Sequence, residues 1–293
     1  INYSIMNYKI LVTGANGQLG YELKKILSLD SSYELYFTDA DTLDITDSNS
    51  VNDFFKNLKI DFIINAAAYT AVDKAEIEKD IAENVNVAAV KNLAICAKNY
   101  KAKIIHISTD YVFDGKKSFP YVETDETNPL GYYGYSKLLG EKEMISIAPH
   151  GAIIRTSWLY STHGNNFVKT IINKASIDNQ NLQVVYDQIG SPTYARDLAI
   201  CINLMIKNFD FDDIEIFHFS NEGVASWYDF AHAILKICKI DKNIIPIETH
   251  QINQLADRPK YSVMSKNKIK STLNINIPHW CDSLIDMINN LNK

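Results

Sequence analysis

The 293-residue sequence predicts an α/β fold built around a doubly wound parallel sheet. In the first half of the chain, short apolar runs alternate with amphipathic segments of helical period, which is typical of parallel strands joined by crossover helices. A glycine-rich turn separates the first apolar run from the first helical segment. The chain is long enough to bury a large core, and its composition, 46% hydrophobic and 22% charged, is that of a globular protein.

The predicted strands are short apolar runs, and the predicted helices are longer amphipathic segments. In chain order the strands cover residues 9–13, 34–38, 61–65, 103–107, 152–155, 183–186 and 215–219. The helices cover residues 21–29, 48–57, 80–99, 166–175, 194–207 and 227–238, and a further one contains residues 133–141. After residue 155 the alternation becomes less regular. We therefore expect a large domain at 1–155, with returning segments near 182–220, and a smaller lobe formed mainly by 156–293.

The turn after the first predicted strand has the composition of a phosphate-binding corner. Its glycines allow a tight turn and a close approach of a pyrophosphate to a helix N-terminus. The spacing is G-x-x-G-x-x-G rather than G-x-G-x-x-G, and a plain βα turn is the alternative. The position between a strand and a helix favours a Rossmann-type domain that binds NAD(P). We expect the cofactor to contact Gly14, Asn16, Gly17, Gln18 and Leu19.

Acidic and small residues follow the second and third predicted strands. Asp39 lies 19 residues after Gly20, where a carboxylate is expected to bind the adenosine ribose and to repel a 2′-phosphate. No arginine follows it, which favours NADH over NADPH. Asp44 and Ile45 are expected at the adenine edge, although they equally suit the cap of the helix that starts at Ser48. Small residues that permit close approach of the cofactor follow the third strand: Ala66, Ala67 and Ala68.

A tyrosine and a lysine four residues apart, Tyr133 and Lys137, share one face of a predicted helix. An adjacent ammonium is expected to lower the pKa of the phenol toward neutral pH. Taken alone, the pair is weak evidence, because this spacing more often marks a surface lysine beside a packed tyrosine. Thr109 ends the fourth predicted strand, where its hydroxyl either forms a turn or hydrogen-bonds a carbonyl oxygen that becomes an alkoxide. Together these three residues form the predicted catalytic group, and Tyr133 and Lys137 also belong to the predicted cofactor site.

Charge and composition exclude several classes of protein. The formal net charge is −6 with a pI near 5.7, and no basic run suggests a nucleic-acid or membrane partner. No apolar run approaches the ~20 residues of a membrane span, and the residues before Tyr8 do not form a signal peptide. Met6 is a candidate natural start. We expect a cytoplasmic protein with four free thiols and no zinc site, since no cysteine or histidine pair has ligand spacing.

Eight motifs keep a fixed order along nearly the whole chain: TGANGQLG (13–20), NAAAYTAVDKAE (65–76), STDYVFDG (108–115), NPLGYYGYSK (128–137), RTSWLY (155–160), GNNFVKT (164–170), DQIGSPT (187–193) and ADRPKYSVM (256–264). With these motifs the chain resembles the dTDP-4-dehydrorhamnose reductases, a family of the extended short-chain dehydrogenase/reductase superfamily. The resemblance implies an NAD(P)H-dependent oxidoreductase that reduces dTDP-4-dehydro-L-rhamnose to dTDP-L-rhamnose. That reaction is the last step of dTDP-rhamnose biosynthesis, which supplies cell-surface polysaccharides.

The resemblance also implies roles for individual residues. Hydride moves from C4 of the nicotinamide to the C4 carbonyl carbon of the sugar, Tyr133 donates the proton, Lys137 holds the nicotinamide ribose and Thr109 steadies the oxygen. Arg258 is a candidate phosphate ligand, with a surface ion pair as the alternative. Thr109 is also an implied substrate-binding residue. The others are Tyr69, Thr70, Val72, Tyr111, Phe113, Trp158, Asn165 and Asn166.

Departures from related sequences narrow these expectations. Similar 4,6-dehydratases carry Thr-Asp-Glu where this chain has Thr109-Asp110-Tyr111, and the pKa of a tyrosine is far too high to replace that glutamate. Some family members bind Mg²⁺ between subunits through glutamates, but Arg196 stands where such an acid is expected. No metal is therefore predicted, and the protein is a monomer or a homodimer. Reduction of another nucleotide-linked 4-ketosugar stays open, as does a regulatory role like that of the methionine adenosyltransferase β subunit.

Overall fold

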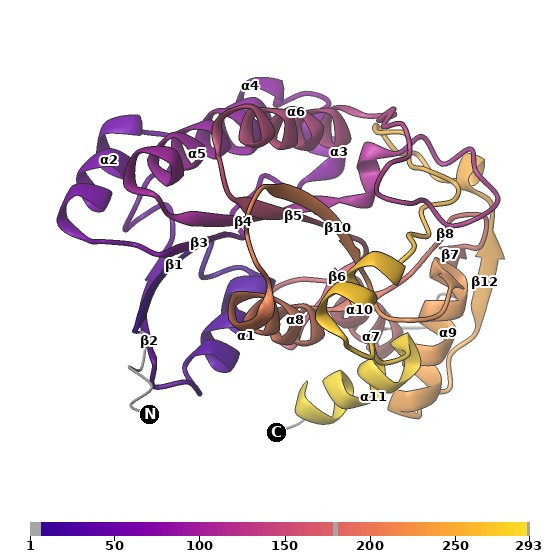
Figure 1. Ribbon diagram of the computed structural model, residues 1–293. Coiled ribbons are helices and arrows are strands. Elements are labelled where there is room, and N and C mark those ends of the chain that lie inside the picture. The colour runs from indigo at the N-terminus through magenta and orange to yellow at the C-terminus, as the bar shows by residue number, and fades with distance from the viewer. Residues whose placement is uncertain (1–6, 178–180, 292–293) are drawn as a thin grey trace.

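The computed structural model describes residues 7–177 and 181–291, so the candidate start at Met6 lies outside the described residues. A six-stranded parallel sheet with the strand order β2-β1-β3-β4-β5-β10 forms its centre (Figure 1). The strands are β1 (Tyr8–Thr13), β2 (Tyr33–Thr38), β3 (Phe62–Asn65), β4 (Lys103–Thr109), β5 (Gly151–Thr156) and β10 (Ile214–Phe219). This arrangement confirms the doubly wound sheet that the sequence predicts.

Helices cover both faces of the sheet (Figure 1). One face carries α2 (Ser48–Asn57), α5 (Ala89–Tyr100) and α6 (Tyr132–Ile147). The other face carries α1 (Gln18–Leu27), α8 (Ala195–Asn208) and α10 (Asn267–Leu273). Each face has its own apolar core, because alternate strand residues point to opposite sides: Leu11 and Ile63 pack under the first set, Ile10 and Ile64 under the second.

The helix predicted at 80–99 is interrupted. It consists of α4 (Lys79–Glu83), a π-helical turn at Asn84–Ala88 and α5, and the short α3 (Val72–Ala75) precedes it. Within the π turn, the buried Asn86 side chain accepts a hydrogen bond from the Tyr69 backbone N–H (2.9 Å) and donates to the Ser136 hydroxyl (3.0 Å). The π turn thus directs the Asn86 side chain toward the segment that follows β3 and toward α6. An unbroken α-helix would place this side chain elsewhere.

The second half of the chain builds a smaller region beside the sheet. Its helices are α7 (Phe167–Ser176), α9 (Trp227–Cys238) and α11 (Trp280–Leu291), which share a third apolar core. Its strands pair in twos: β6 (Leu159–Tyr160) with β9 (Thr193–Tyr194), β8 (Ile189–Gly190) with β11 (Ala225–Ser226), and β7 (Leu182–Val185) with β12 (Ile244–Ile247). Two 3₁₀ turns, Asp110–Val112 and Thr249–Gln251, complete the elements.

Of the two strands expected to return to the large sheet, only one does. β10 joins its edge beside β5, whereas β7 pairs with β12 in the smaller region. A short apolar strand does not specify its partner, so the sequence alone does not distinguish the two outcomes. The domain boundary near residue 155 stays a prediction. Cys96 and Cys201 are buried as expected, Cys238 and Cys281 only partly, and all four are free. No described helix is long and apolar enough to cross a bilayer.

Replacing Gly140 with alanine should destabilise the protein. Alanine favours helix by about 1 kcal/mol over glycine, but a Cβ at position 140 would lie 2.2 Å from the Asn86 carbonyl oxygen of the π turn. Overpacking of this kind costs about 1–3 kcal/mol. We expect a lower free energy of unfolding in urea for Gly140→Ala, and a change within about 0.5 kcal/mol for the exposed control Lys142→Ala. Equal stability of the two variants would contradict the close packing of α6.

Candidate active site

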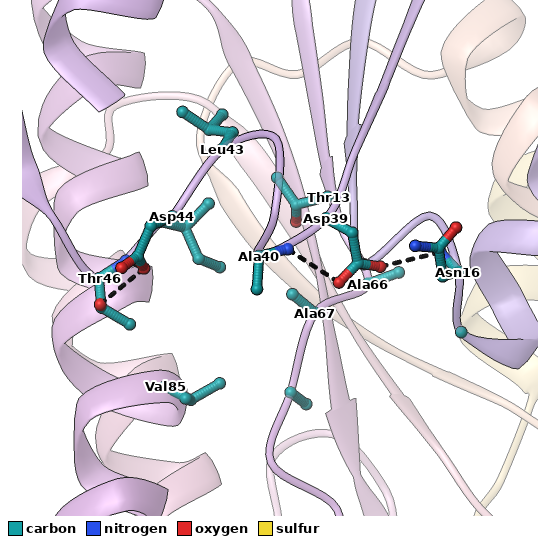
Figure 2. Close-up of a pocket in the computed structure, with 14 residues that line it drawn as sticks. Thr13, Asn16, Asp39, Ala40, Leu43, Asp44, Thr46, Ala66, Ala67 and Val85 are labelled. Carbon is teal, nitrogen blue, oxygen red and sulfur yellow. Dashed lines mark hydrogen bonds between the residues drawn. The ribbon is translucent and has the colours of Figure 1, made fainter. Parts of the chain in front are cut away.

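A pocket of about 440 Å³ lies at the carboxyl ends of β1, β2 and β3 (Figure 2). The chain runs from β1 outward to β2 and then crosses back to β3, so the pocket sits at the point where the strand order reverses. Nine of the predicted cofactor residues line it: Gly14, Asn16, Gly17, Asp39, Asp44, Ile45, Ala66, Ala67 and Ala68. Five further lining residues were not predicted from the sequence: Thr13, Ala40, Leu43, Thr46 and Val85.

Two glycines of the corner are required by their surroundings. Gly14 has a φ of +68°, and a Cβ there would lie 2.7 Å from the Ala67 backbone. A Cβ at Gly20 would lie 2.3 Å from the Gly14 carbonyl oxygen. Gly17 is the N-cap of α1 and lines the pocket, and no side chain caps that helix, so its first N–H groups are not taken by a capping side chain. This is the geometry of an anion site at a helix N-terminus.

The Asp39 carboxylate is fixed at the mouth of this pocket. It accepts hydrogen bonds from the backbone N–H groups of Asn16 and Ala40, both at 2.9 Å (Figure 2). Asp44 accepts from the Thr46 hydroxyl (2.7 Å), and the cap of α2 is Asp47 rather than Asp44. Asp44 therefore lines the pocket and does not cap the helix. Among the described residues that line the pocket, none is basic.

Four predicted cofactor residues do not line this pocket: Gln18, Leu19, Tyr133 and Lys137. The Gln18 side chain points toward the smaller region, where its amide oxygen accepts a hydrogen bond from Asn166 (3.0 Å) and its amide N–H donates to the Leu159 carbonyl oxygen (3.5 Å). Leu19 is buried in the core beneath the sheet. Both follow the glycine corner directly, but the first turn of α1 directs their side chains away from the strand ends.

The predicted catalytic residues meet where β4 ends and α6 begins. Tyr133 lies in the first turn of α6, its hydroxyl is hydrogen-bonded to the Thr109 side chain, and its ring meets that of Tyr111 edge-on at 5.6 Å. Burial raises the pKa of Tyr133 to about 12, and the Thr109 hydrogen bond opposes that rise. The expectation that Lys137 brings this pKa toward neutrality is wrong, because desolvation outweighs any favourable charge.

Lys137 points beneath α6 toward the sheet. Its side chain is almost fully buried, and Nζ donates to the Ile107 carbonyl oxygen at 2.7 Å and lies 3.4 Å from His106 Nε2. Burial lowers the pKa of Lys137 to about 8, and the Glu141 carboxylate one turn later opposes that change. Lys137 is therefore protonated at neutral pH and close to its point of titration just above it.

Glu141 has an ion pair of its own. Arg155 of β5 donates to both of its oxygens, from Nε at 2.9 Å and from Nη2 at 2.7 Å, and the Ser108 hydroxyl donates to the same carboxylate. Glu141 and Arg155 are both buried. Asp110 is also buried, which raises its pKa to about 6, and its Oδ1 accepts from the Thr109 hydroxyl at 3.1 Å. Glu141 and Arg155 were not predicted from the sequence, although a charged residue inside an apolar strand is a usable signal.

The implied substrate residues are spread around this centre. The Tyr69 hydroxyl donates to Glu78, Val72 begins α3, and Thr70 is exposed. Asn166 is the N-cap of α7 and accepts from the Lys169 N–H (3.1 Å), while its neighbour Asn165 is exposed. These positions border the same side of the molecule, but the structure does not gather them around one described pocket.

Two aromatic residues of the implied substrate site, Phe113 and Trp158, each stack on an aromatic ring outside that site. Phe113 is fully buried and stacks on Tyr121, with ring centroids 4.2 Å apart. Trp158 adopts a left-handed conformation (φ +48°) and stacks on Trp227 at 3.6 Å. A Cβ at Gly190 would touch the Trp158 ring at 2.6 Å, so glycine is needed for this packing.

A second pocket, of about 840 Å³, opens in the smaller region. Phe167, Lys174 and Trp227 line it together with Arg258 and segments of β7, β12 and the loop that follows β12. The Arg258 guanidinium makes two hydrogen bonds to Asp73, at 2.7 and 3.1 Å. The ion pair that the sequence offered as the alternative role for Arg258 is therefore present. Arg258 also contacts Tyr111, whose ring meets Tyr133, and so joins this pocket to the catalytic group.

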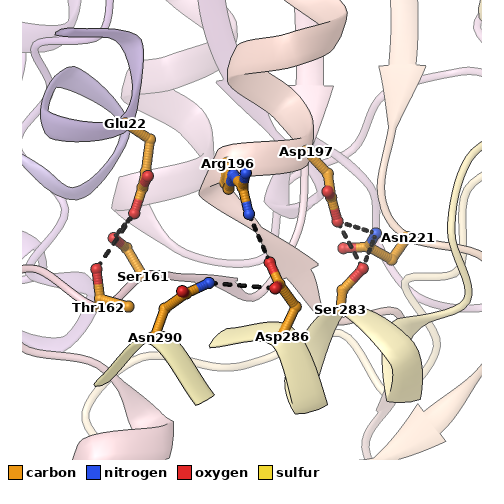
Figure 3. Close-up of polar contacts among 9 residues, drawn as sticks. All are labelled: Glu22, Ser161, Thr162, Arg196, Asp197, Asn221, Ser283, Asp286 and Asn290. Atoms are coloured by element: carbon orange, nitrogen blue, oxygen red, sulfur yellow. Dashed lines mark hydrogen bonds and ion pairs between the residues drawn. The ribbon is translucent and has the colours of Figure 1, made fainter. Parts of the chain in front are cut away.

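The region around Arg196 does not fit a divalent cation (Figure 3). Arg196 is paired with Asp286 at 2.7 Å, and Asp197 accepts from Ser283 and Asn221. Glu22 accepts from the Ser161 hydroxyl at 2.6 Å. A guanidinium stands among these acids, and each carboxylate already has a hydrogen-bonded donor. Within residues 7–177 and 181–291, no three His, Cys, Asp or Glu side chains are grouped as metal ligands.

Comparisons with known proteins agree with this geometry. A family model described as the RmlD substrate binding domain matches residues 8–293. The dTDP-4-dehydrorhamnose reductase of Aggregatibacter actinomycetemcomitans is 42% identical over 281 residues, which are 93% of this chain and 95% of that protein. Two solved dTDP-4-dehydrorhamnose reductases each cover 97% of this chain and 100% of their own. The Clostridium acetobutylicum structure has a TM-score of 0.93 at 43% identity, and the Bacillus anthracis structure, in complex with NADP, 0.92 at 38%.

These relatives match the chain almost from end to end, and the family model spans both the glycine corner and the predicted catalytic residues. The protein therefore belongs to the dTDP-4-dehydrorhamnose reductase family.

Proposed function

We propose that this protein reduces dTDP-4-dehydro-L-rhamnose to dTDP-L-rhamnose with NADH or NADPH. The observation that carries the proposal is the placement of Tyr133 against Thr109 at the end of β4, with Lys137 buried one turn further along α6 and the glycine-corner pocket at the ends of β1, β2 and β3 of the same sheet. Family membership supplies the sugar and the reaction class. A regulatory subunit has no need of a buried ammonium and a buried phenol, an arrangement that costs free energy and is typical of active sites.

The residues of this chain supply the proton side of the reaction. Bound nicotinamide would supply the hydride, which adds to the C4 carbonyl carbon as the carbonyl π electrons move to oxygen. Tyr133 is protonated throughout the neutral range because its pKa is about 12, so its O–H can be given to that oxygen. Thr109 can donate a hydrogen bond in the same place when its single O–H, which donates to Asp110 in this structure, turns to the substrate oxygen. The phenolate left on Tyr133 would be stabilised by the Lys137 ammonium as a charge one helical turn away, while Nζ keeps its bond to the Ile107 carbonyl oxygen.

We assign the nucleotide part of the substrate to the second pocket. A thymine ring suits the aromatic surface of Phe167 and Trp227, and a diphosphate suits Lys174 and Arg258. The contact of Arg258 with Tyr111 leads from there to the catalytic group, so a sugar attached to the diphosphate would extend toward Tyr133.

We further propose that NADH is preferred. Asp39 is held at the pocket by two backbone N–H groups, and Asp44 lines the same pocket. A 2′-phosphate placed there would meet two carboxylates, and no basic residue among the described lining residues would offset them. The Bacillus anthracis relative was solved with NADP, so the preference is a property to be tested on this chain. The oligomeric state and the cytoplasmic location remain predictions.

Tyr133→Phe should abolish turnover. Removal of the phenol oxygen deletes the proton donor, and loss of a general acid lowers kcat by about 10²–10⁴-fold. The measurement is the loss of nicotinamide absorbance with dTDP-4-dehydro-L-rhamnose, alongside cofactor binding by fluorescence, which should be retained. Tyr135→Phe is the matched control, because Tyr135 lies on the same helix and is 46% exposed. Near-normal turnover by Tyr133→Phe would contradict the assigned role, and inactivity of the native protein would contradict the substrate.

Asp39→Asn should shift cofactor preference toward NADPH. The native protein is expected to have the higher kcat/KM with NADH, and removing the carboxylate charge should raise the NADPH/NADH ratio of kcat/KM by about tenfold or more. Asp41→Asn removes a charge two residues away that does not line the pocket, and it should leave the ratio unchanged. A native preference for NADPH would overturn the assignment of Asp39.

Lys174→Ala should raise the KM for the sugar nucleotide by about three- to tenfold and change kcat little. Its charge is expected to act on the bound diphosphate and not on the reacting carbonyl, so its loss weakens ground-state and transition-state binding alike. Lys169 lies on the same helix outside the second pocket and provides the control Lys169→Ala. The same KM for Lys174→Ala and the native protein would rule out this placement of the nucleotide.

A further inference from the structure

Three polar side chains form a row across the centre of the sheet. In the register of the parallel strands, Thr13 of β1 is the partner of Asn65 of β3, and Asn65 is the partner of His106 of β4. Partners in adjacent parallel strands point to the same face, so the three side chains lie side by side. All three are buried, with exposed fractions of 1%, 0% and 0%. Burying three polar groups in an otherwise apolar layer is unfavourable unless each is hydrogen-bonded.

The row is a continuous chain of hydrogen bonds. The Thr13 hydroxyl donates to Asn65 Oδ1 at 2.8 Å, and Asn65 Nδ2 lies 3.0 Å from His106 Nδ1. At its far end, His106 Nε2 lies 3.4 Å from Lys137 Nζ. At its near end, Thr13 lines the pocket assigned to the cofactor. The row therefore joins that pocket to the catalytic lysine through the interior of the sheet.

We propose that His106 is a positioning residue for Lys137: its neutral imidazole, oriented by Asn65 and Thr13, hydrogen-bonds Nζ and fixes where that amine points. The inference rests on the proposed function, in which Lys137 acts beside Tyr133. His106 touches neither substrate nor reacting atoms, and it acts only through Lys137.

The other groups around Lys137 leave this role to His106. Glu141 follows on the same helix, but its carboxylate is occupied by Arg155 and Ser108. Asp110 and Tyr133 are each bonded to Thr109, and neither bonds Lys137 Nζ. Within the described residues, Nζ makes no ion pair, and its protein partners are the Ile107 carbonyl oxygen and His106. An ammonium has three N–H groups, so two bind the sheet and one remains for the nicotinamide side.

The imidazole suits this role because it is neutral. Burial, together with the nearby Lys137 charge, holds the pKa of His106 well below its ordinary value, so the ring is neutral. A neutral ring carries one proton, either on Nδ1 or on Nε2. When Lys137 is an ammonium, Nε2 must accept and Nδ1 must donate to the Asn65 amide oxygen. When Lys137 is neutral, Nε2–H donates to the amine and Nδ1 accepts from the amide N–H. The structure has Asn65 Nδ2 against Nδ1, which is the second arrangement, so the amide must turn over when Lys137 is charged and the orientation of Asn65 follows that charge.

The test compares three replacements of buried histidines. His106→Phe keeps the ring volume and removes the acceptor, His106→Gln keeps an amide oxygen that can accept from Nζ, and His218→Phe is the control. His218 is buried in β10, where its ring meets Phe113 edge-on at 5.6 Å. Two quantities are measured: the pH profile of kcat, and the pKa of Lys137 from NMR of protein labelled with ¹³C-lysine, with its signal assigned by its loss in Lys137→Met.

Loss of the acceptor should disfavour the ammonium. We expect His106→Phe to lower the pKa of Lys137 by about one pH unit or more, to move the alkaline fall of kcat down by the same amount, and to reduce kcat at pH 8 about tenfold. His106→Gln should keep most of the native pKa of Lys137 and of the native pH profile of kcat, and His218→Phe should change neither quantity. If His106→Phe does not fold, Asn65→Leu, which frees Nδ1, should produce a smaller shift in the same direction.

The two readouts separate this inference from the proposed function. A native protein without turnover, in which the Lys137 pKa still depends on His106, would refute the proposed substrate and keep the positioning role. An active protein in which His106→Phe leaves both the Lys137 pKa and the pH profile unchanged would overturn the inference. So would equal effects of the Phe and Gln variants, because a structural role alone does not distinguish an acceptor from an apolar ring.

Discussion

The close approach of α6 to its neighbours is the constraint on which the active site depends. A Cβ at Gly134 would lie 2.1 Å from the Tyr111 carbonyl oxygen, and one at Gly140 would lie 2.2 Å from the Asn86 carbonyl oxygen. Only a helix with glycine at both positions can lie this near. Because it does, Lys137 and Glu141, one turn apart, reach down to the sheet and not out to solvent. Tyr133, one turn earlier, is brought under Tyr111 and against Thr109 by the same contact.

The sheet face under α6 carries polar side chains that contact the charged groups of Lys137 and Glu141. Strand residues two apart point to the same side, and here His106 meets Lys137 while Ser108 meets Glu141. The strand register extends each contact sideways, from His106 to Asn65 and from Ser108 to Arg155. A buried ion pair is stabilising only when its remaining donors and acceptors are satisfied, and the rows of polar partners meet much of that demand. Burial is unfavourable for the charged form of Lys137, and this same burial lowers its pKa to about 8.

The sequence was sufficient for features that are local. The glycine corner, the strands that precede and follow it, and the residues that end those strands are close together in the chain, so Asp39 and Ala66–Ala68 could be placed at one edge of the sheet from their positions alone. The sequence was insufficient for features whose structure depends on contacts with a distant segment of the chain. The pairing of β7 with β12, the second pocket formed by residues near 167–188 and 247–258, and the π turn that serves Asn86 all depend on segments far apart in the sequence. The pKa of Tyr133 was misjudged for the same reason, because the depth of burial is not a property of the motif.

The stacking of Trp158 on Trp227 has an optical consequence. The chain has three tryptophans, and all of them lie in the core of the smaller region, with Trp227 at the wall of the second pocket and Trp280 packed edge-on against Phe230. None of the three lines the pocket at the glycine corner. The intrinsic emission of the protein therefore originates on the side assigned to the sugar nucleotide. With the sugar nucleotide in the second pocket, its quenching would arise at the stacked pair, whereas a dinucleotide at the glycine corner would affect the emission only across a distance, through energy transfer to its reduced ring.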